Sequence, residues 1–405
     1  MNELLLEAET NFSLGRTDCI SLYIHIPFCK TKCGYCDFNT YQGIENLIPG
    51  FVDAVCIDIQ NWLTTLSNPS ISTVFFGGGT PSLLNKTQVE QILNTIKASG
   101  NLIPETEITL ESNPDDLTLQ KCSELYTTGI NRLSIGIQAL QNNLLTILNR
   151  RHSNTQAIQA IINGHAAGFK NISGDLMYGL PSQTTGDWET TVTELVKANP
   201  SHISMYSLTI EQGTPFHKMF TQGSIQLPSD DEIADMYAWA QTFLEQKTYN
   251  QYEISNWSQK TQESQHNLAY WKRDPYIGIG PGAHSNLGNV RYWNIKSPSQ
   301  YMQKLMNPTN SQSIESLIVN NPIIEDYEIL TTRQMASELM FLGLRLAEGI
   351  DCSKYIQSYG FDLKTIFSKE LHKLEQEGLL EITGNIIKLP KDKIFIANRI
   401  FEEFI

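Results

Sequence analysis

The chain has 405 residues, of which 40% are hydrophobic and 18% charged, a composition typical of a soluble globular protein with two or three domains. Its formal net charge of −14 argues against a nucleic-acid partner, because binding to phosphates depends on Lys and Arg side chains. No apolar run is long enough to span a bilayer, and residues 1–20 lack the basic flank and apolar stretch of a signal peptide. We therefore expect a cytoplasmic protein that begins with a short N-terminal tail.

Residues 21–250 alternate between strand-like and helix-like runs. Strands are predicted at residues 22–26, 73–76, 107–110, 132–137, 172–177, 202–208 and 252–254, and helical patterns stand between them, for example at 51–66 and 89–96. This alternation predicts a parallel sheet with crossover helices. Its length and order favour an α/β fold, a partial TIM-like (β/α) barrel. Active sites of such barrels form where the strands end.

The rest of the chain divides into two further predicted parts. Residues 251–325 form an extension that carries two unusual segments, HNLAYW and GIGPGAHS. Residues 326–405 are mostly helical in pattern, with two short strands about a turn at residues 383–385, which suits a small winged-helix-like domain. Its acidic end, FEEF, favours an interaction or lid role over DNA binding.

Three of the seven cysteines, Cys29, Cys33 and Cys36, lie in one loop after the first predicted strand. An odd number of cysteines without an export signal argues against a disulfide framework. A four-iron cluster uses thiolate ligands, and three of them leave one iron open. A zinc site completed by His25 is an alternative, although the chain has no second C-x-x-C pair. A redox pair of Cys33 and Cys36 is another, and it leaves Cys29 unexplained.

The spacing C-x-x-x-C-x-x-C after YIHIPF resembles the cluster loop of the radical S-adenosylmethionine (SAM) superfamily. That resemblance implies a [4Fe-4S] cluster on the three cysteines, whose open iron is chelated by SAM. It further implies that an electron from the cluster can cleave SAM to a 5'-deoxyadenosyl radical. A donor such as flavodoxin or ferredoxin would supply that electron if SAM is cleaved.

Other loops after predicted strands agree with the same resemblance. Taken singly, each polar residue there could be a helix cap or a surface charge. Five polar residues at the ends of five strands are better explained by a shared site. The residues that match the superfamily's SAM contacts are Tyr23, Tyr35, Gly78, Gly79, Thr80, Glu111, Gln138, Arg150 and Asp175.

Across nearly its whole length the chain is similar to the branch that contains the oxygen-independent coproporphyrinogen dehydrogenase HemN and the haem chaperone HemW. The dehydrogenase has an additional cysteine two residues after the third cluster cysteine, where this chain has Phe38. It also has a longer N-terminal arm. Both departures point away from turnover of coproporphyrinogen.

The segment HNLAYW matches the H-N-x-x-Y-W motif of HemW, which is implicated in haem binding. The match implies that His266, Asn267, Tyr270 and Trp271 contact haem, because an imidazole can ligate iron and aromatic rings can cover the macrocycle. His284, in GIGPGAHS, is an alternative iron ligand in a tight loop expected near the SAM pocket.

The resemblance thus implies a haem chaperone that carries haem as cargo and delivers it to apoproteins, including membrane-bound respiratory proteins. Whether the chain is also an enzyme stays open. The alternatives are coproporphyrinogen III dehydrogenase and a radical SAM enzyme that acts on another substrate, such as RNA. A homodimer is compatible with the sequence. With a net charge of −14, any association with a membrane should run through a protein partner.

Overall fold

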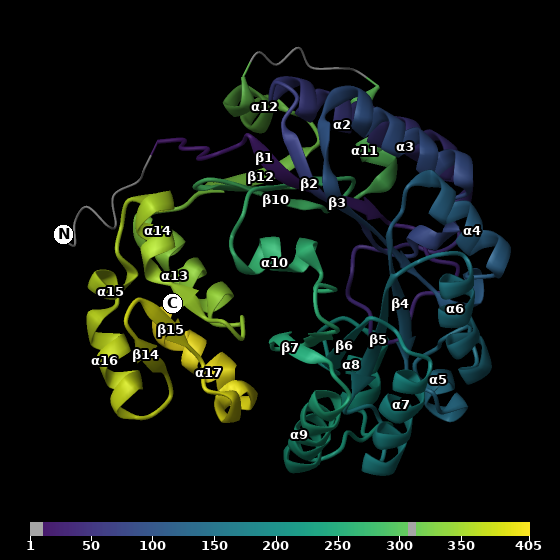
Figure 1. Cartoon of the computed structure of the whole chain (residues 1–405). Helices are drawn as coiled ribbons and strands as arrows, with labels where there is room; N and C mark the ends of the chain where they lie inside the picture. Colours follow the sequence, from purple (N-terminus) through teal and green to yellow (C-terminus); the bar gives the residue numbers. More distant parts are fainter. Residues whose placement is uncertain (1–10, 307–312) are drawn as a thin grey trace.

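The computed structural model describes residues 11–306 and 313–405, so the first ten residues of the predicted N-terminal tail lie outside it. A twelve-stranded sheet curves through the molecule in the order β12-β11-β10-β9-β1-β2-β3-β4-β5-β6-β8-β7 (Figure 1). Within this sheet, the six strands that come first in the sequence pair in parallel and in chain order, as predicted. They are β1 (Cys19–Ile26), β2 (Ser70–Gly78), β3 (Asn101–Ser112), β4 (Arg132–Gln138), β5 (Asn171–Tyr178) and β6 (His202–Ser207).

Crossover helices cover the outer face of these strands (Figure 1). In the helix at Lys86–Ser99, the side chain of Asn85 accepts a hydrogen bond from Gln88 N, and the side chain of Gln88 accepts one from Asn85 N. Buried apolar residues follow along this helix at spacings of three and four. The partial (β/α) barrel and the helices predicted at 51–66 and 89–96 are confirmed. The crossover helices are α2 (Ile48–Thr65), α3 (Lys86–Ser99), α4 (Leu119–Thr128), α5 (Asn142–Ile147), α6 (Asn154–Ala166) and α7 (Thr185–Lys197).

The strand predicted at 252–254 is present but breaks the parallel order. It is β7 (Asn250–Glu253), and it pairs antiparallel with β8 (Asn256–Ser258). Only two residues join these strands, which is too short for a parallel crossover. At the other edge β9 (Tyr276–Ile279) runs parallel to β1, followed by the antiparallel strands β10 (His284–Leu287), β11 (Val290–Asn294) and β12 (Ile324–Ile329). Residues 251–325 therefore extend both edges of the one sheet.

One short helix, α10 (Gln265–Trp271), lies inside the curve of the sheet, between the barrel and the C-terminal domain (Figure 1). It carries the HNLAYW segment. The remaining helices of this region are α8 (Pro215–Thr221), α9 (Asp230–Gln246), α11 (Pro298–Leu305) and α12 (Ile314–Asn320).

The C-terminal domain has its own core and a three-stranded antiparallel sheet in the order β13-β15-β14. The turn predicted at 383–385 joins the last two of these strands. The domain's elements are α13 (Thr332–Gly343), β13 (Ile350–Asp351), α14 (Cys352–Tyr359), α15 (Leu363–Ile366), α16 (Ser368–Gln376), β14 (Glu381–Thr383), β15 (Ile386–Lys388) and α17 (Ala397–Phe401).

Backbone hydrogen bonds tie this domain to β7 at one edge of the large sheet, from Ile254 N to Arg345 O (3.1 Å) and from Ala347 N to Tyr252 O (2.9 Å). The domain also follows directly from β12, the strand at the opposite edge. It therefore bridges the two ends of the open sheet and closes the ring seen in Figure 1. Within the described residues, no helix combines the length and apolar character needed to cross a bilayer.

Candidate functional site

A cavity of about 450 Å³ lies at the carboxyl ends of the parallel strands. Polar side chains and glycines that follow successive strands converge on it, as expected for a parallel barrel. Most of the residues predicted from the sequence meet there. These are Cys29, Cys33, Cys36, Tyr35, Gly78, Gly79, Thr80, Glu111, Gln138, Arg150 and Asp175.

The three cysteines lie on the loop that follows β1. The loop is anchored where Cys29 N donates to Tyr41 O (2.9 Å) and where Gly34 O accepts from Phe216 N (2.9 Å). Thr80 Oγ1 lies 3.5 Å from Cys29 Sγ, within hydrogen-bonding distance. Burial raises the pKa of the Cys29 and Cys36 thiols, so their thiolates need a nearby cation, which a bound metal cluster supplies.

Glycine at position 79 is a steric requirement of the cavity wall. A Cβ there would lie 2.6 Å from Phe28 O, 2.7 Å from Ile26 O and 3.1 Å from Cys29 Sγ. Gly79 N donates to Ile26 O (2.8 Å), which holds this segment against the strand that precedes the cysteine loop. The backbone of the glycine segment is therefore packed directly against the thiol of Cys29.

Two carboxylates face the cavity from β3 and β5, the strands on either side of β4. Glu111 accepts a hydrogen bond from Gly78 N (3.0 Å), and burial together with the charge of Asp175 raises the pKa of Glu111 to about 7. Asp175 accepts hydrogen bonds from Ser134 Oγ and Ser173 Oγ, both at 2.6 Å. Such carboxylates can accept hydrogen bonds from an ammonium group or from ribose hydroxyls.

Arg150 links the far wall of the cavity to the cysteine loop. Its Nη2 donates to Asn113 Oδ1 and to Gly136 O, both at 2.6 Å, and its Nη1 lies 3.5 Å from Cys33 Sγ. Arg150 Nε and Ser112 Oγ are buried without a hydrogen-bond partner. Because buried polar groups are normally paired, these two atoms lack a partner that a bound carboxylate could supply.

The residues present therefore fit a four-iron cluster and SAM. The three thiols would hold the cluster, and the glycine segment, the two carboxylates and Arg150 would contact SAM. A cluster with an open iron supplies one-electron reduction of its ligand. The protein's part is to position that ligand and to shelter it.

Tyr23 is the one predicted SAM contact that does not line the cavity. Its hydroxyl lies 3.0 Å from His25 Nδ1, and its ring stacks on Phe75. His25 Nε2 is in turn 2.9 Å from Asn39 O. Both ring nitrogens of His25 thus have partners, one from Tyr23 and one from the loop that follows the cysteines.

The HNLAYW segment is divided between two environments. Asn267 lines the cavity, whereas His266 is only 1% exposed, with Nδ1 2.7 Å from Thr73 Oγ1 and Nε2 2.9 Å from Tyr270 OH. Burial lowers the pKa of His266 to about 3, so the ring is neutral. Trp271 packs under the guanidinium of Arg345, 4.7 Å away, in the C-terminal domain.

Neither predicted haem ligand lines the cavity. The structure leaves no free nitrogen on His266, and this departs from the expectation that its ring is available to iron. His284 begins β10, is exposed, and stacks on Trp293 with ring centroids 5.6 Å apart. The loop before it does lie beside the cysteine loop, since Asn39 Nδ2 donates to Pro281 O (3.0 Å).

Sequence reasoning missed the residues that hold the predicted contacts in place. Asn113 orients Arg150, and Ser134 and Ser173 orient Asp175. A signal was present, because alternate residues of a strand share one face: Ser134 and Gly136 alternate with the predicted Gln138 on β4, and all three line the cavity.

Comparisons with known proteins agree with this geometry. The profile of the radical SAM superfamily matches residues 23–195, and that of the HemN C-terminal domain matches residues 330–392. The haem chaperone HemW of Bacillus subtilis is 33% identical over 389 residues, covering 95% of this chain and 99% of the relative. HemW of Lactococcus lactis is 31% identical over 385 residues, covering 95% and 97% of the two chains.

The solved structure of the coproporphyrinogen III oxidase HemN from Escherichia coli, described as a radical SAM enzyme, superimposes with a TM-score of 0.79 at 22% identity. It covers 96% of this chain and 90% of that one. At this identity the likeness establishes the fold alone. The identity and coverage of the HemW relatives go further, and with the cysteine loop and the cavity they show that the chain belongs to the HemW family of the radical SAM superfamily.

Proposed function

We propose that the protein is a haem chaperone, which binds haem and delivers it to apoproteins while carrying a [4Fe-4S] cluster and SAM. The observation that carries this proposal is the similarity to curated haem chaperones over 95% of the chain. The cavity is lined by three thiols and by most of the predicted SAM contacts, which supports the proposal of a cluster and SAM as resident cofactors.

Phe38 supports the chaperone over the dehydrogenase. It occupies the position two residues after Cys36, where the dehydrogenase branch has a further cysteine, and it is 62% exposed at the cavity wall. An exposed aromatic ring offers apolar surface to a flat ligand and no thiolate to a metal.

We propose that Nε2 of His266 is the haem ligand once its hydrogen bond to Tyr270 has opened. Ligation through Nε2 requires Tyr270 to release its hydrogen bond, while the bond from Nδ1 to Thr73 can remain and orient the ring. The neutral imidazole is the form that binds iron. Because the ring is buried, α10 must shift before haem reaches it.

We propose haem-accepting apoproteins, among them membrane-bound respiratory proteins, as recipients, and flavodoxin or ferredoxin as the electron donor if SAM is cleaved. The chaperone would act in the cytoplasm and reach a membrane through a protein partner, because a net charge of −14 opposes attraction to anionic lipid. We also propose that the chaperone self-associates as a homodimer.

The test uses one anaerobically reconstituted sample for two measurements. Titration with haem, followed by the Soret absorbance, should give saturable binding, and the loaded protein should pass haem to an apo b-type cytochrome. Incubation with SAM, reductant and coproporphyrinogen III should give no protoporphyrinogen, with the E. coli HemN enzyme as positive control. Formation of protoporphyrinogen at enzyme-like rates would overturn the proposal.

The iron ligand is tested by two matched histidine variants. His266→Ala should weaken haem binding or shift the Soret band without loss of cluster, and His284→Ala should leave both unchanged. The reverse result would move the iron to the exposed end of β10.

A further inference from the structure

The first turn of α10 contributes a residue to the cavity wall. Asn267 belongs to the cavity lining together with residues from three different strands of the barrel, namely Phe75, Glu111, Arg132 and Ser134. The helix therefore contributes to the lining of the same cavity as the glycine segment and the two carboxylates.

The side-chain amide of Asn267 has no hydrogen-bond partner within the described part of the chain. Its backbone N–H donates to Ser264 Oγ at 3.4 Å, and the side chain is only partly buried. An amide offers two donor hydrogens and an acceptor oxygen. At the wall of a cavity, an amide left open in this way is suited to bind a ligand.

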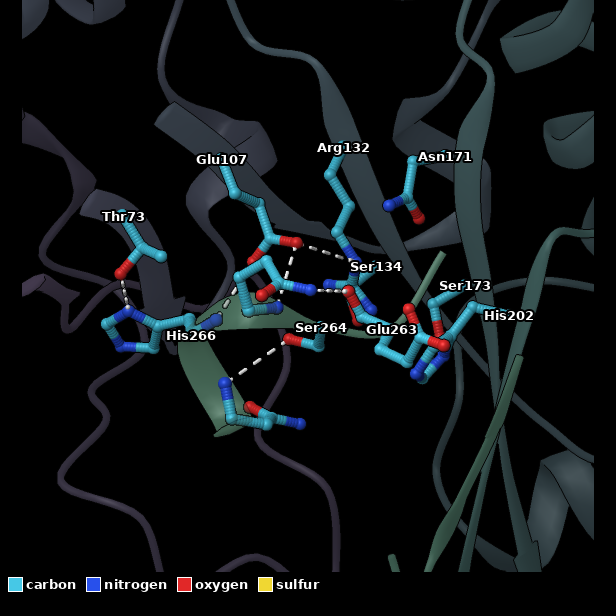
Figure 2. A network of polar contacts seen from close by, with 12 residues as sticks. Thr73, Glu107, Arg132, Ser134, Asn171, Ser173, His202, Glu263, Ser264 and His266 are labelled. Carbon is cyan, nitrogen blue, oxygen red and sulfur yellow. Dashed lines mark hydrogen bonds and ion pairs between the residues drawn. The ribbon is translucent and has the colours of Figure 1, made fainter. Parts of the chain in front are cut away.

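A buried ion pair fixes the position of this turn. The carboxylate of Glu107 accepts hydrogen bonds from His266 N and Gln265 N, both at 3.1 Å, and Arg132 Nε lies 4.0 Å from it. Figure 2 shows Glu107 and Arg132 on neighbouring strands beside the start of the helix. Both side chains are nearly fully buried, so the turn is held by the barrel interior.

A second set of contacts joins the same turn to Asp175. Ser173 Oγ donates to Asp175 Oδ1 (2.6 Å) and lies 2.8 Å from His202 Nδ1. Since Ser173 gives its one proton to the carboxylate, Nδ1 of His202 must be the donor between them. Figure 2 shows Ser173 and His202 side by side.

The chain of hydrogen bonds continues from His202 to α10. Burial lowers the pKa of His202, so its ring is neutral and Nε2 accepts from Tyr252 OH (2.9 Å). Tyr252 OH in turn accepts from Ser264 N (3.3 Å), and Ser264 caps α10. One continuous relay thus connects a predicted SAM contact to the turn that carries Asn267.

We propose that Asn267 is a direct ligand contact of the SAM cavity, with Glu107 and Tyr252 as its positioning residues. The HNLAYW segment then serves both ligands of the protein, since His266 and Asn267 are adjacent on one turn. The proposal rests on SAM as the cavity's ligand within the proposed function.

The experiment measures SAM affinity by isothermal titration of reconstituted protein in the absence of haem. Asn267→Ala should weaken SAM binding about tenfold, the effect of one lost hydrogen bond to a sheltered ligand. The matched control is Gln265→Ala on the same turn, whose side chain is exposed and, among the described residues, bonds to Glu263 O alone. It should retain the wild-type affinity.

Tyr252→Phe removes the relay's hydroxyl and tests positioning by a double-mutant cycle. It should weaken SAM binding in the wild-type background and have little further effect in Asn267→Ala, because it acts through Asn267. Additive losses would overturn the positioning role. Cluster content and melting temperature establish that each variant is folded.

Unchanged SAM affinity in Asn267→Ala would overturn the ligand contact. Loss of haem binding with unchanged SAM binding would do the same, since it would place Asn267 at the haem site alone. The chaperone proposal itself depends on haem binding by the wild-type protein. The two proposals can therefore fail separately.

Discussion

Single residues around the cysteine loop are packed with little space to spare. A Cβ on Gly34 would lie 2.8 Å from the ring of Phe216, and one on Gly78 would lie 2.5 Å from the ring of His25. Close packing of this kind transmits small changes, because interiors have few voids to absorb an added methyl group. Substitutions at the loop should therefore affect cluster and fold together.

We predict that Cys29, Cys33 and Cys36 hold one four-iron cluster. Replacing all three with Ala should abolish cluster absorption and the paramagnetic signal after anaerobic reconstitution and reduction, because thiolates are the ligands. Cys19→Ala is the control, since Cys19 is exposed and begins β1 at the end away from the loop. A tightly bound zinc ion without any cluster signal would contradict the prediction.

Gly79→Ala should lower cluster content and destabilise the protein by about 1–3 kcal/mol, the cost of overpacking. The reason is the backbone oxygen of Phe28, 2.6 Å from the added Cβ, which cannot rotate away. Gly186→Ala is the matched control, because its Cβ meets only Thr184 Oγ1 at 3.9 Å. Urea unfolding and iron analysis give both quantities, and equal stability of the two variants would count against the steric argument.

Tyr270→Phe should speed haem binding. The substitution removes the hydroxyl that is hydrogen-bonded to His266 Nε2 (2.9 Å). The ring can then reach haem without first breaking this hydrogen bond, whose net contribution is about 0.5–1.5 kcal/mol. In the wild-type protein the observed rate should level off with increasing haem, since opening limits binding. Stopped-flow Soret traces measure both rates. A rate that rises linearly with haem in both proteins would mean that no opening step exists.

Among the elements, α10 contacts both the cavity and the C-terminal domain. Its first turn meets the cavity, and its last residue, Trp271, packs on Arg345 of the C-terminal domain. Just beyond it, Arg273 Nε donates to Glu338 on α13 at 2.6 Å, and Arg291 of β11 pairs with the same carboxylate. The domain is thus docked on the barrel through a largely buried ion cluster.

Glu338→Ala should destabilise the protein by about 3–5 kcal/mol, because Arg273 would be left buried without its counter-charge. Glu328→Ala removes the exposed partner of Arg291 and should cost less than about 1 kcal/mol. Urea unfolding compares the two variants, and limited proteolysis should show earlier release of the C-terminal domain in the first. Similar losses of unfolding free energy in both variants would show that the buried ion cluster stabilises the protein no more than the exposed pair does.

The sequence predicted the elements whose pattern is local and periodic. The strands around Leu22, Val74 and Leu133, and the helix that contains Val89, follow from alternating or three-to-four spacing of apolar residues. The pairing of β9 with β1 could not be predicted in this way, since it joins distant segments. The hydrogen bond between His266 and Thr73 could not be predicted for the same reason, because the two residues are 193 positions apart in the sequence.

At the scale of the whole molecule, burial of ionisable groups links stability to pH. Asp58 on α2 is fully buried, and Tyr301 OH on α11 donates to it at 2.5 Å. Burial raises its pKa from 3.8 to about 7. The folded state therefore binds this proton more tightly than the unfolded state, and the resulting stability is present at low pH and lost as the pH rises through about 7.

Asp58→Asn should consequently gain stability relative to the wild-type protein by about 2–3 kcal/mol more at pH 8 than at pH 5. Asparagine keeps the shape and an acceptor for Tyr301 without a charge to bury. Denaturant unfolding at the two pH values measures the difference, and Asp53→Asn, an exposed site on the same helix, should show none. A pH-independent effect of Asp58→Asn would contradict the raised pKa.

The place of β1 in the sheet has a consequence for synthesis of the chain. Ser21 of β1 pairs with Thr73 of β2 on one side and with Tyr276 of β9 on the other. Because β9 is synthesised about 250 residues after β1, the strand that leads into the cysteine loop has one open edge until most of the protein has left the ribosome. Closure of so long a loop is slow relative to local folding. One edge of this strand therefore stays unpaired for most of translation, and the nascent chain is most prone to edge-to-edge association in that interval.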